Sequence, residues 1–92
     1  MATLRSHQRA AQDLRRRLAA NLRAQRERLG LTQERAAERV GFSLQYYQRI
    51  ERQIVNVPLD TVARCALAFS VDPQELMEPV GVRPAKPQAR TH

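Results

Sequence analysis

A single glycine between two short amphipathic segments constrains the fold of this chain more than any other feature. Gly41 follows a segment in which Thr32 is suited to cap a helix and the apolar residues share one face. Ser43 is suited to cap the next segment, in which Tyr47 and Ile50 share a face. Because only glycine adopts a left-handed backbone cheaply, we expect Gly41 to end the first helix and turn the chain directly into the second.

The length and charge of the chain favour a binding module over an enzyme. Its 92 residues allow one small domain with a modest core, and its formal net charge is +7. Nearly all of the basic residues are arginines, whose planar guanidinium suits contacts with phosphates and guanine edges. No set of residues suggests a catalytic apparatus.

Two helices joined by a tight glycine turn have helix-turn-helix geometry, in which the second helix enters the major groove of DNA. From about Leu18 to Met77 the chain resembles the phage-repressor and Cro-like helix-turn-helix proteins, often called the XRE family. The matching residues are Leu22, Arg23, Arg26, Gly30 to Glu34, Ala37, Val40, Gly41, Ser43, Tyr47, Arg49 to Arg52 and Leu59 to Thr61. The resemblance implies an all-α, compact five-helix fold like that of lambda repressor, with the helix-turn-helix at the second and third helices and a basic N-terminal extension.

Three positions depart from the pattern of that family. Gln25 stands where an apolar residue is usual, Gln53 replaces a glycine after the recognition helix, and Ser70 replaces a glycine at the end of the fourth helix. These departures concern loop conformation rather than the fold. In the fourth helix, Pro58 suits the first turn, and the expected inward-facing residues are Leu59, Val62, Cys65, Ala66 and Phe69.

The pattern divides the chain into three parts. Residues 1–13 form a basic N-terminal arm or helix extension, residues 14–78 the DNA-binding domain, and residues 79–92 a disordered basic C-terminal tail. We expect the first helix to begin near Ser6 or Arg9 and to run to Leu29. Two interpretations of the arm stay open, namely a contact with DNA phosphates and a solvated helix face that contacts nothing.

Residues near the start of the second motif helix are the candidates for contact with bases, because that end faces the floor of the groove. They are Ser43, Leu44, Gln45 and Arg49. Gln45 can pair both amide atoms with adenine, Arg49 can fork onto guanine or hold a phosphate, and Leu44 offers an apolar surface to a thymine methyl group.

A second set of polar residues is expected to contact the sugar-phosphate backbone, which positions the domain without reading the sequence. The set consists of Gln33, Tyr46, Gln48, Arg52 and Asn56. For Gln33 this role is implied by the family resemblance. For Tyr46 the alternative is that the ring packs beside the turn, which is the more common position for a tyrosine near a helix start.

The resemblance also implies an ion pair between Arg26 in the first helix and Glu51 at the end of the recognition helix. A symmetric homodimer is expected as well, because one short recognition helix covers few base pairs and such repressors read two half-sites. The candidate interface consists of apolar residues that a monomer leaves over, namely Ile54, Val55, Val57, Leu67 and Met77.

Neither a metal nor another cofactor is expected. Cys65 is the single cysteine, and His7 and His92 lie far apart in tail-like sequence, so no zinc site is plausible. With no secretion signal and no long apolar run, we expect a cytoplasmic protein without membrane association.

These expectations lead to a transcriptional regulator that binds a specific double-stranded DNA sequence. The favoured interpretation is a repressor that acts by occupying a palindromic operator as a dimer. The alternative is an antitoxin or restriction-modification controller that acts partly through a protein partner held by the tails.

Overall fold

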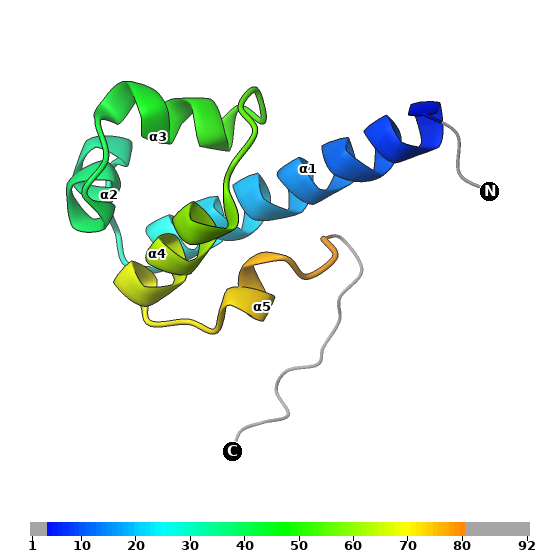
Figure 1. The fold of residues 1–92 in the computed structure, drawn as a ribbon. Helices are drawn as coiled ribbons and strands as arrows, with labels where there is room; N and C mark the ends of the chain where they lie inside the picture. Colours follow the sequence, from blue (N-terminus) through cyan, green and yellow to red (C-terminus); the bar gives the residue numbers. More distant parts are fainter. Residues whose placement is uncertain (1–3, 81–92) are drawn as a thin grey trace, which may run out of the picture.

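Five helices make up the part of the chain that the computed structural model describes, residues 4–80 (Figure 1). They are α1 (Leu4–Arg28), α2 (Gln33–Val40), α3 (Leu44–Glu51), α4 (Leu59–Phe69) and α5 (Pro73–Leu76). The expected all-α fold with the helix-turn-helix at α2 and α3 is therefore confirmed. Of the expected C-terminal tail, the residues from 81 onward lie outside the described part of the chain.

Helix α1 is longer than the sequence indicated at its start. It begins at Leu4 rather than near Ser6 or Arg9, so the described part of the N-terminal extension is helical and continuous with the domain. The N-terminal end of α1 projects beyond the other helices (Figure 1). At the other end the helix stops at Arg28, because Gly30 takes a left-handed backbone with φ of 69°.

Local hydrogen bonds fix the starts of α2 and α3 and the turn between these two helices. Thr32 Oγ1 accepts a hydrogen bond from the Arg35 N–H, and Ser43 Oγ accepts one from the Tyr46 N–H, each over 3.1 Å. Between the two caps, Gly41 is left-handed with φ of 91°, and its N–H donates to the carbonyl of Ala37. The chain therefore changes direction within a few residues and α3 starts at a defined angle to α2.

All five described helices contribute to the core, which fixes the orientation of α3. Tyr47 and Ile50 on α3 are almost fully buried together with Leu22 on α1 and Phe69 on α4. Burying an aliphatic or aromatic side chain of this size contributes about 1.5 to 3 kcal/mol. One face of the short α3 is thereby held against the domain and the opposite face is free to contact a ligand.

One expectation about the inward-facing residues of helix α4 is wrong. Leu59 was expected on the inward face, but the residue is 85% exposed. Pro58 is the cap rather than part of the first turn, so Leu59 is the first residue of α4 and lies at the end that extends past the core. The other expected inward residues are buried, and Leu67, which falls off the inward face, is 81% exposed.

The two positions where the family has glycine keep the backbone that glycine would favour. Gln53 and Ser70 have φ of 66° and 57°, both in the left-handed region. Each residue therefore adopts the left-handed backbone that glycine adopts easily, and this conformation costs free energy because neither residue is glycine.

Helix α5 closes the fold over α1. Asp72 caps it by accepting a hydrogen bond from the Gln74 N–H over 2.9 Å, and Pro73 occupies the first helical position. The Asn21 side chain donates to the Leu76 carbonyl over 2.9 Å, and Arg17 donates to the Met77 carbonyl over 3.3 Å. These contacts hold the segment after α5 against the middle of α1.

Candidate nucleic-acid interface

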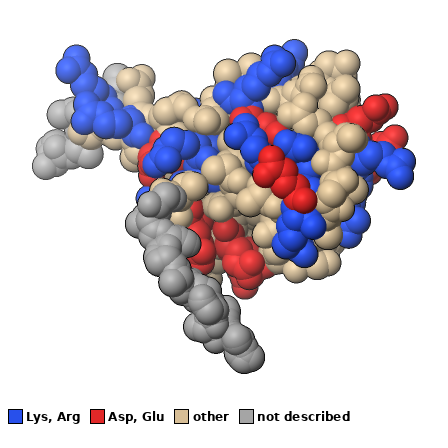
Figure 2. Space-filling model, turned by 180° about the vertical axis from the view of Figure 1, so that it is seen from behind, with Lys and Arg blue, Asp and Glu red and all other residues tan. Residues whose placement is uncertain are grey.

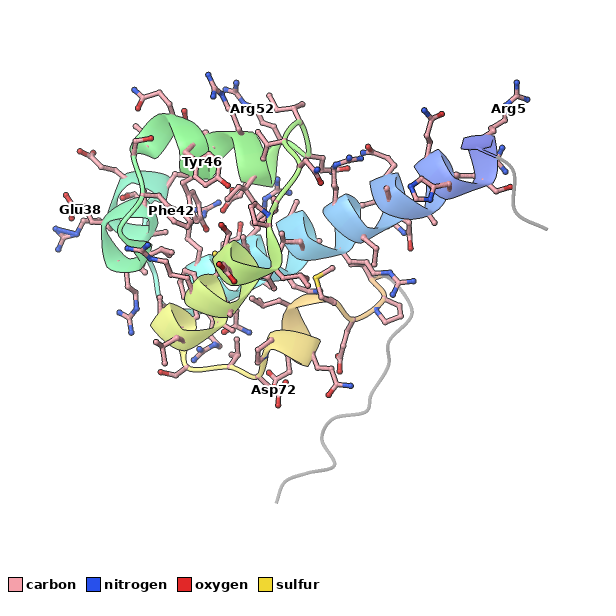
Figure 3. The ribbon with its side chains drawn as sticks, in the orientation of Figure 1. Arg5, Glu38, Phe42, Tyr46, Arg52 and Asp72 are labelled. Atoms are coloured by element: carbon pink, nitrogen blue, oxygen red, sulfur yellow. The ribbon has the colours of Figure 1, made fainter. Side chains whose placement is uncertain are left out.

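Three polar side chains on the outer face of α3 are exposed and unpaired. Gln45, Arg49 and Arg52 follow one another at intervals of four and three residues, which places them on one side of the helix. None of the three side chains makes a hydrogen bond or ion pair with another residue in the described range 4–80. Figure 3 shows Arg52 at the upper edge of the molecule, pointing away from the domain.

The end of α3 is tied to α1 through Glu51. Arg26 Nε donates to Glu51 Oε2 over 2.9 Å and Arg26 Nη2 donates to Oε1 over 3.2 Å, so the expected ion pair is present as a two-point contact. Arg26 Nη1 also donates to the Leu31 carbonyl over 3.2 Å. The Glu51 side chain is 1% exposed, so the charge is removed from water and compensated by Arg26.

Gln33 and Gln48 extend this network across the start of α2. Gln33 Nε2 donates to Glu51 Oε1 over 2.9 Å, and Gln48 Nε2 donates to Gln33 Oε1 over 3.1 Å. Because an ionised carboxylate only accepts hydrogen bonds, Glu51 determines which way the Gln33 amide points. Both glutamines were expected to contact phosphate, and the structure holds each of them in a defined orientation before any DNA arrives.

The network also changes the acidity of Glu51. Burial alone would raise the pKa of its carboxyl group, but the hydrogen bonds from Arg26 and Gln33 outweigh burial and hold the pKa below the ordinary value. Glu51 is therefore ionised at neutral pH, as the two-point contact with Arg26 requires.

Arg23 is a candidate that the sequence interpretation did not single out for the site. Its Nε lies 3.8 Å from Glu51 Oε1, and 51% of its side chain is exposed. Since the closer Arg26 already neutralises Glu51, the charge of Arg23 is left largely uncompensated at the surface next to Gln33. Its one-turn spacing from Arg26 on α1 was the signal in the sequence that could have identified it.

At the other end of α3, an aromatic cluster supports the turn. The rings of Phe42 and Tyr46 meet edge to face with centroids 5.0 Å apart, and the guanidinium of Arg64 lies 5.5 Å from the centroid of Phe42. Arg64 Nε donates to the carbonyl of Val40 over 2.9 Å and so caps the end of α2. Of the two alternatives for Tyr46, the structure shows the ring packed beside the turn.

The other residues that were expected to contact DNA do not all lie on the outer face of α3. Ser43 is exposed and caps α3, whereas Leu44 is half-buried at the first helical position. Asn56 is exposed in the loop between α3 and α4, where it lines an apolar groove rather than the outer face of α3.

Basic side chains lie along the edge of the molecule that carries α3 and on the projecting end of α1. Figure 2 shows them there, and it also shows others interspersed with acidic side chains over the rest of that face. Figure 3 shows Arg5 near the start of α1 and Arg52 after α3 pointing to the same side. A surface of this charge attracts a polyanion such as DNA.

The residues expected at a dimer interface differ in exposure and in position. Val57 and Met77 line the groove that also contains Asn56, and Val55 is half-buried against the core. Ile54 is 63% exposed in the loop after α3, whereas Leu67 lies on the outer side of α4, outside the groove.

Cys65 is fully buried, and burial raises the pKa of its thiol to about 11.

Within residues 4–80, no three His, Cys, Asp or Glu side chains are grouped so that they could hold a metal ion. The described helices also include none that combines the length and the apolar character needed to cross a membrane.

Comparison with known proteins agrees with this geometry. The helix-turn-helix family matches residues 22–76 of the chain. A relative from Sinorhizobium fredii, described as an uncharacterized HTH-type transcriptional regulator, y4dJ, is 36% identical over 72 residues, which cover 78% of this chain and 94% of that protein.

Two solved structures share the fold. The hypothetical transcription factor NHTF from Neisseria has 34% sequence identity and a TM-score of 0.71, over 76% of this chain and 80% of that chain. The restriction-modification controller protein C.AhdI from Aeromonas hydrophila has 32% identity and a TM-score of 0.63, over 67% of this chain and 90% of that chain. The chain therefore belongs to the XRE-type helix-turn-helix family of DNA-binding transcriptional regulators.

Proposed function

We propose that this protein is a sequence-specific regulator that places α3 in the major groove of double-stranded DNA. The observation that carries the proposal is the contrast between the two sides of α3. The buried side is fixed by Tyr47, Ile50 and the Glu51 network, whereas Gln45, Arg49 and Arg52 on the other side are exposed and unpaired within the described chain. A rigid helix with free polar side chains is what direct reading of bases requires.

The roles of the exposed side chains follow from their chemistry. Gln45 pairs both amide atoms with adenine, and Arg49 forks onto guanine or a nearby phosphate. Leu44, although half-buried, keeps an apolar surface for a thymine methyl group. Ser43 lies one residue earlier, close to the DNA backbone or a base edge.

Phosphate contacts hold the domain in register. Arg52 keeps the role expected from the sequence, and Arg23 joins it because its charge is exposed beside the network. Tyr46 packs beside the turn and Asn56 lines the apolar groove, so neither is assigned a phosphate contact. Gln33 contacts phosphate through its second amide hydrogen, since its carbonyl oxygen accepts from Gln48 and its other hydrogen is donated to Glu51. In this proposal Gln48 is a positioning residue that orients Gln33.

The regulator acts as a repressor by occupying a palindromic operator as a symmetric dimer. One α3 spans only a few base pairs, so two copies spaced by one helical turn of DNA are needed to specify an operator.

A second candidate is a controller that acts partly through a protein partner. The similarity to a restriction-modification controller protein favours it over the antitoxin alternative. The two candidates share the DNA-binding face and differ in whether a second protein is needed for control.

Selection of bound duplexes from a random pool tests the proposal. We expect a palindromic sequence with two half-sites about one helical turn apart. Bound duplexes with no sequence enriched over the starting pool would contradict the proposal.

A further inference from the structure

A groove beside the N-terminal half of α1 has no partner in the described chain. It lies between α1, the loop that follows α3, the start of α4 and the end of α5, and has a volume of about 180 Å³. Its lining is almost entirely apolar, and the residues that matter here are Leu14, Leu18, Val57, Leu59, Val62 and Met77. The helix-turn-helix family model matches residues 22–76, so Leu14 and Leu18 on the α1 wall precede the matched segment.

Two leucines continue the core-facing stripes of their helices beyond the core. Leu14 is one turn before the buried Leu18 on α1, and Leu59 is one turn before the buried Val62 on α4. Both residues line the groove, yet they are 46% and 85% exposed. Two neighbouring helices that both carry an apolar stripe past the end of their own core indicate a surface that is covered in the functional protein.

The α1 wall is held in place by hydrogen bonds to the turn after α3 and to the end of α5. Gln12 Nε2 donates to Gln53 Oε1 over 3.2 Å, which joins the extension of α1 to the turn directly after α3. Arg17 and Asn21 donate to backbone carbonyls at the end of α5. The groove is therefore a fixed feature, and its position is linked to the end of the recognition helix.

The size of the groove argues against a drug-sized effector as its occupant. Sites for such ligands usually have volumes of about 300 to 1,000 Å³, and this groove is smaller. It can accept one or two apolar side chains from a protein surface. Leu59, the most exposed large apolar residue of the described chain, is such a side chain and stands on the rim of the same groove.

The charges around the groove point to a second copy of this chain. Arg15 lines it on the α1 side, and Asp60, the residue after Leu59, is exposed at the start of α4. Neither forms an ion pair with a residue in the range 4–80. A two-fold axis places the basic wall of one copy against the acidic end of α4 in the other, and exchanges the two Leu59 side chains.

We propose that this groove is the homodimer interface, in which Leu59 of each copy inserts between α1 and α4 of the other. The inference rests on the proposed function, which requires two copies, and it deepens it by assigning a role to the N-terminal extension of α1. The inference changes the interface expected from the sequence. Val57 and Met77 stay in the interface, Leu14 and Leu59 are added to it, and Leu67 is removed from it.

A pair of matched leucine variants tests the interface. Leu59→Glu and Leu67→Glu change side chains of similar exposure on the same helix, but only Leu59 lines the groove. We expect wild-type protein and Leu67→Glu to be dimers by light scattering at tens of micromolar. Leu59→Glu should raise the dimer dissociation constant by more than about a hundredfold, because each dimer contains two such sites. A monomeric wild type, or equal behaviour of the two variants, would overturn the proposal.

Charge exchange across the axis provides a second test that does not depend on apolar burial. Arg15→Glu and Asp60→Arg should each weaken the dimer, and the double variant should recover most of the wild-type dissociation constant. A double variant weaker than either single one would overturn the pairing. Thermal unfolding of each variant controls for loss of folding.

Binding to half-site and full-site duplexes separates failure of this inference from failure of the proposed function. Leu59→Glu should bind an isolated half-site with wild-type affinity and lose the extra affinity for the palindrome. A dimer that fails to discriminate between DNA sequences would contradict the regulator proposal alone. Specific binding that is equally retained by Leu59→Glu on the palindrome would contradict the interface alone.

Discussion

The guanidinium of Arg26 forks onto the carboxylate of Glu51, with Nε donating to Oε2 over 2.9 Å and Nη2 to Oε1 over 3.2 Å. The contact joins the first helix to the end of the recognition helix at a point where the Glu51 side chain is only 1% exposed. Glu51 also accepts from Gln33, so one buried carboxylate holds α1, α2 and α3 in fixed relative positions. The orientation of α3 on DNA therefore depends on this group.

Removing Glu51 should destabilise the domain strongly. Glu51→Ala leaves the partly buried Arg26 without its partner, which costs about 3 to 5 kcal/mol for a well-buried pair. In a domain of this size the loss should lower the Tm by more than about 10 °C. Arg28→Ala is the control, because Arg28 is exposed and its hydrogen bond within residues 4–80 is to Gln25 on its own helix. Equal melting temperatures for the two variants would count against the structural role of Glu51.

The stability of the domain should fall at acid pH because of Glu51. Its pKa in the folded protein is held below the ordinary value of 4.5, so the unfolded chain binds the proton more readily. The stabilisation is therefore fully present above pH 4.5 and is lost as the pH falls through the lowered pKa of the folded state.

Urea denaturation of wild type and Glu51→Gln as a function of pH measures this contribution. The pKa of the exposed Asp13 is also lowered, mainly by the hydrogen bond from Arg16, and this effect is common to both proteins. The difference in free energy of unfolding between the two proteins should thus shrink below pH 4.5. A difference that stays constant over that range would refute the assignment to Glu51.

Substitution of Gly41 should cost more than substitution of Gly30. Both glycines have a positive φ, of 91° and 69°, so alanine at either position costs about 1 to 2 kcal/mol. A Cβ at Gly41 would also lie 2.7 Å from Arg64 Nη2, whereas one at Gly30 would meet nothing within 4 Å.

Moving Arg64 aside would sacrifice its hydrogen bond to Val40, so Gly41→Ala should cost about 1 kcal/mol more than Gly30→Ala in urea denaturation. In an Arg64→Ala background that excess should disappear. An excess that persists there would show that the arginine is not its cause.

Replacing Ser70 by glycine should stabilise the protein. Ser70 ends α4 with φ of 57°, and its exposed side chain forms no hydrogen bond with another described residue. Glycine removes the strain of the left-handed backbone and increases the entropy of the unfolded chain, so the net gain should be at most about 1 kcal/mol. Ser70→Ala keeps the strain and is the control. A Tm for Ser70→Gly at or below that of Ser70→Ala would contradict this account.

Features determined by neighbouring residues were the ones that the sequence predicted well. Thr32, Ser43 and Asp72 cap their helices as expected, because a cap needs only a side-chain oxygen two or three residues before its donor. The left-handed backbone at Gly41 follows from the same local logic.

Features that depend on where the core ends were not predicted. Leu59 has the helical angle of an inward residue, but the angle does not reveal that nothing covers the first residue of α4. Likewise, the bond between Gln48 and Gln33 depends on the distance between two helices, which the sequence pattern does not contain. The start of α1 at Leu4 was missed because the apolar stripe that identified the helix begins only at Ala11.

The central claim is that the free face of α3 reads a DNA sequence. The most direct test measures the affinity of the protein for its preferred DNA site and for random duplex DNA at several salt concentrations. Gln45→Ala should lose about 1 to 3 kcal/mol on the preferred site only, whereas Gln74→Ala on α5 should change neither affinity. Arg52→Ala should weaken both affinities about equally and reduce the salt slope by about one unit. Equal affinity of wild-type protein for the preferred and random duplexes at every salt concentration would contradict the claim.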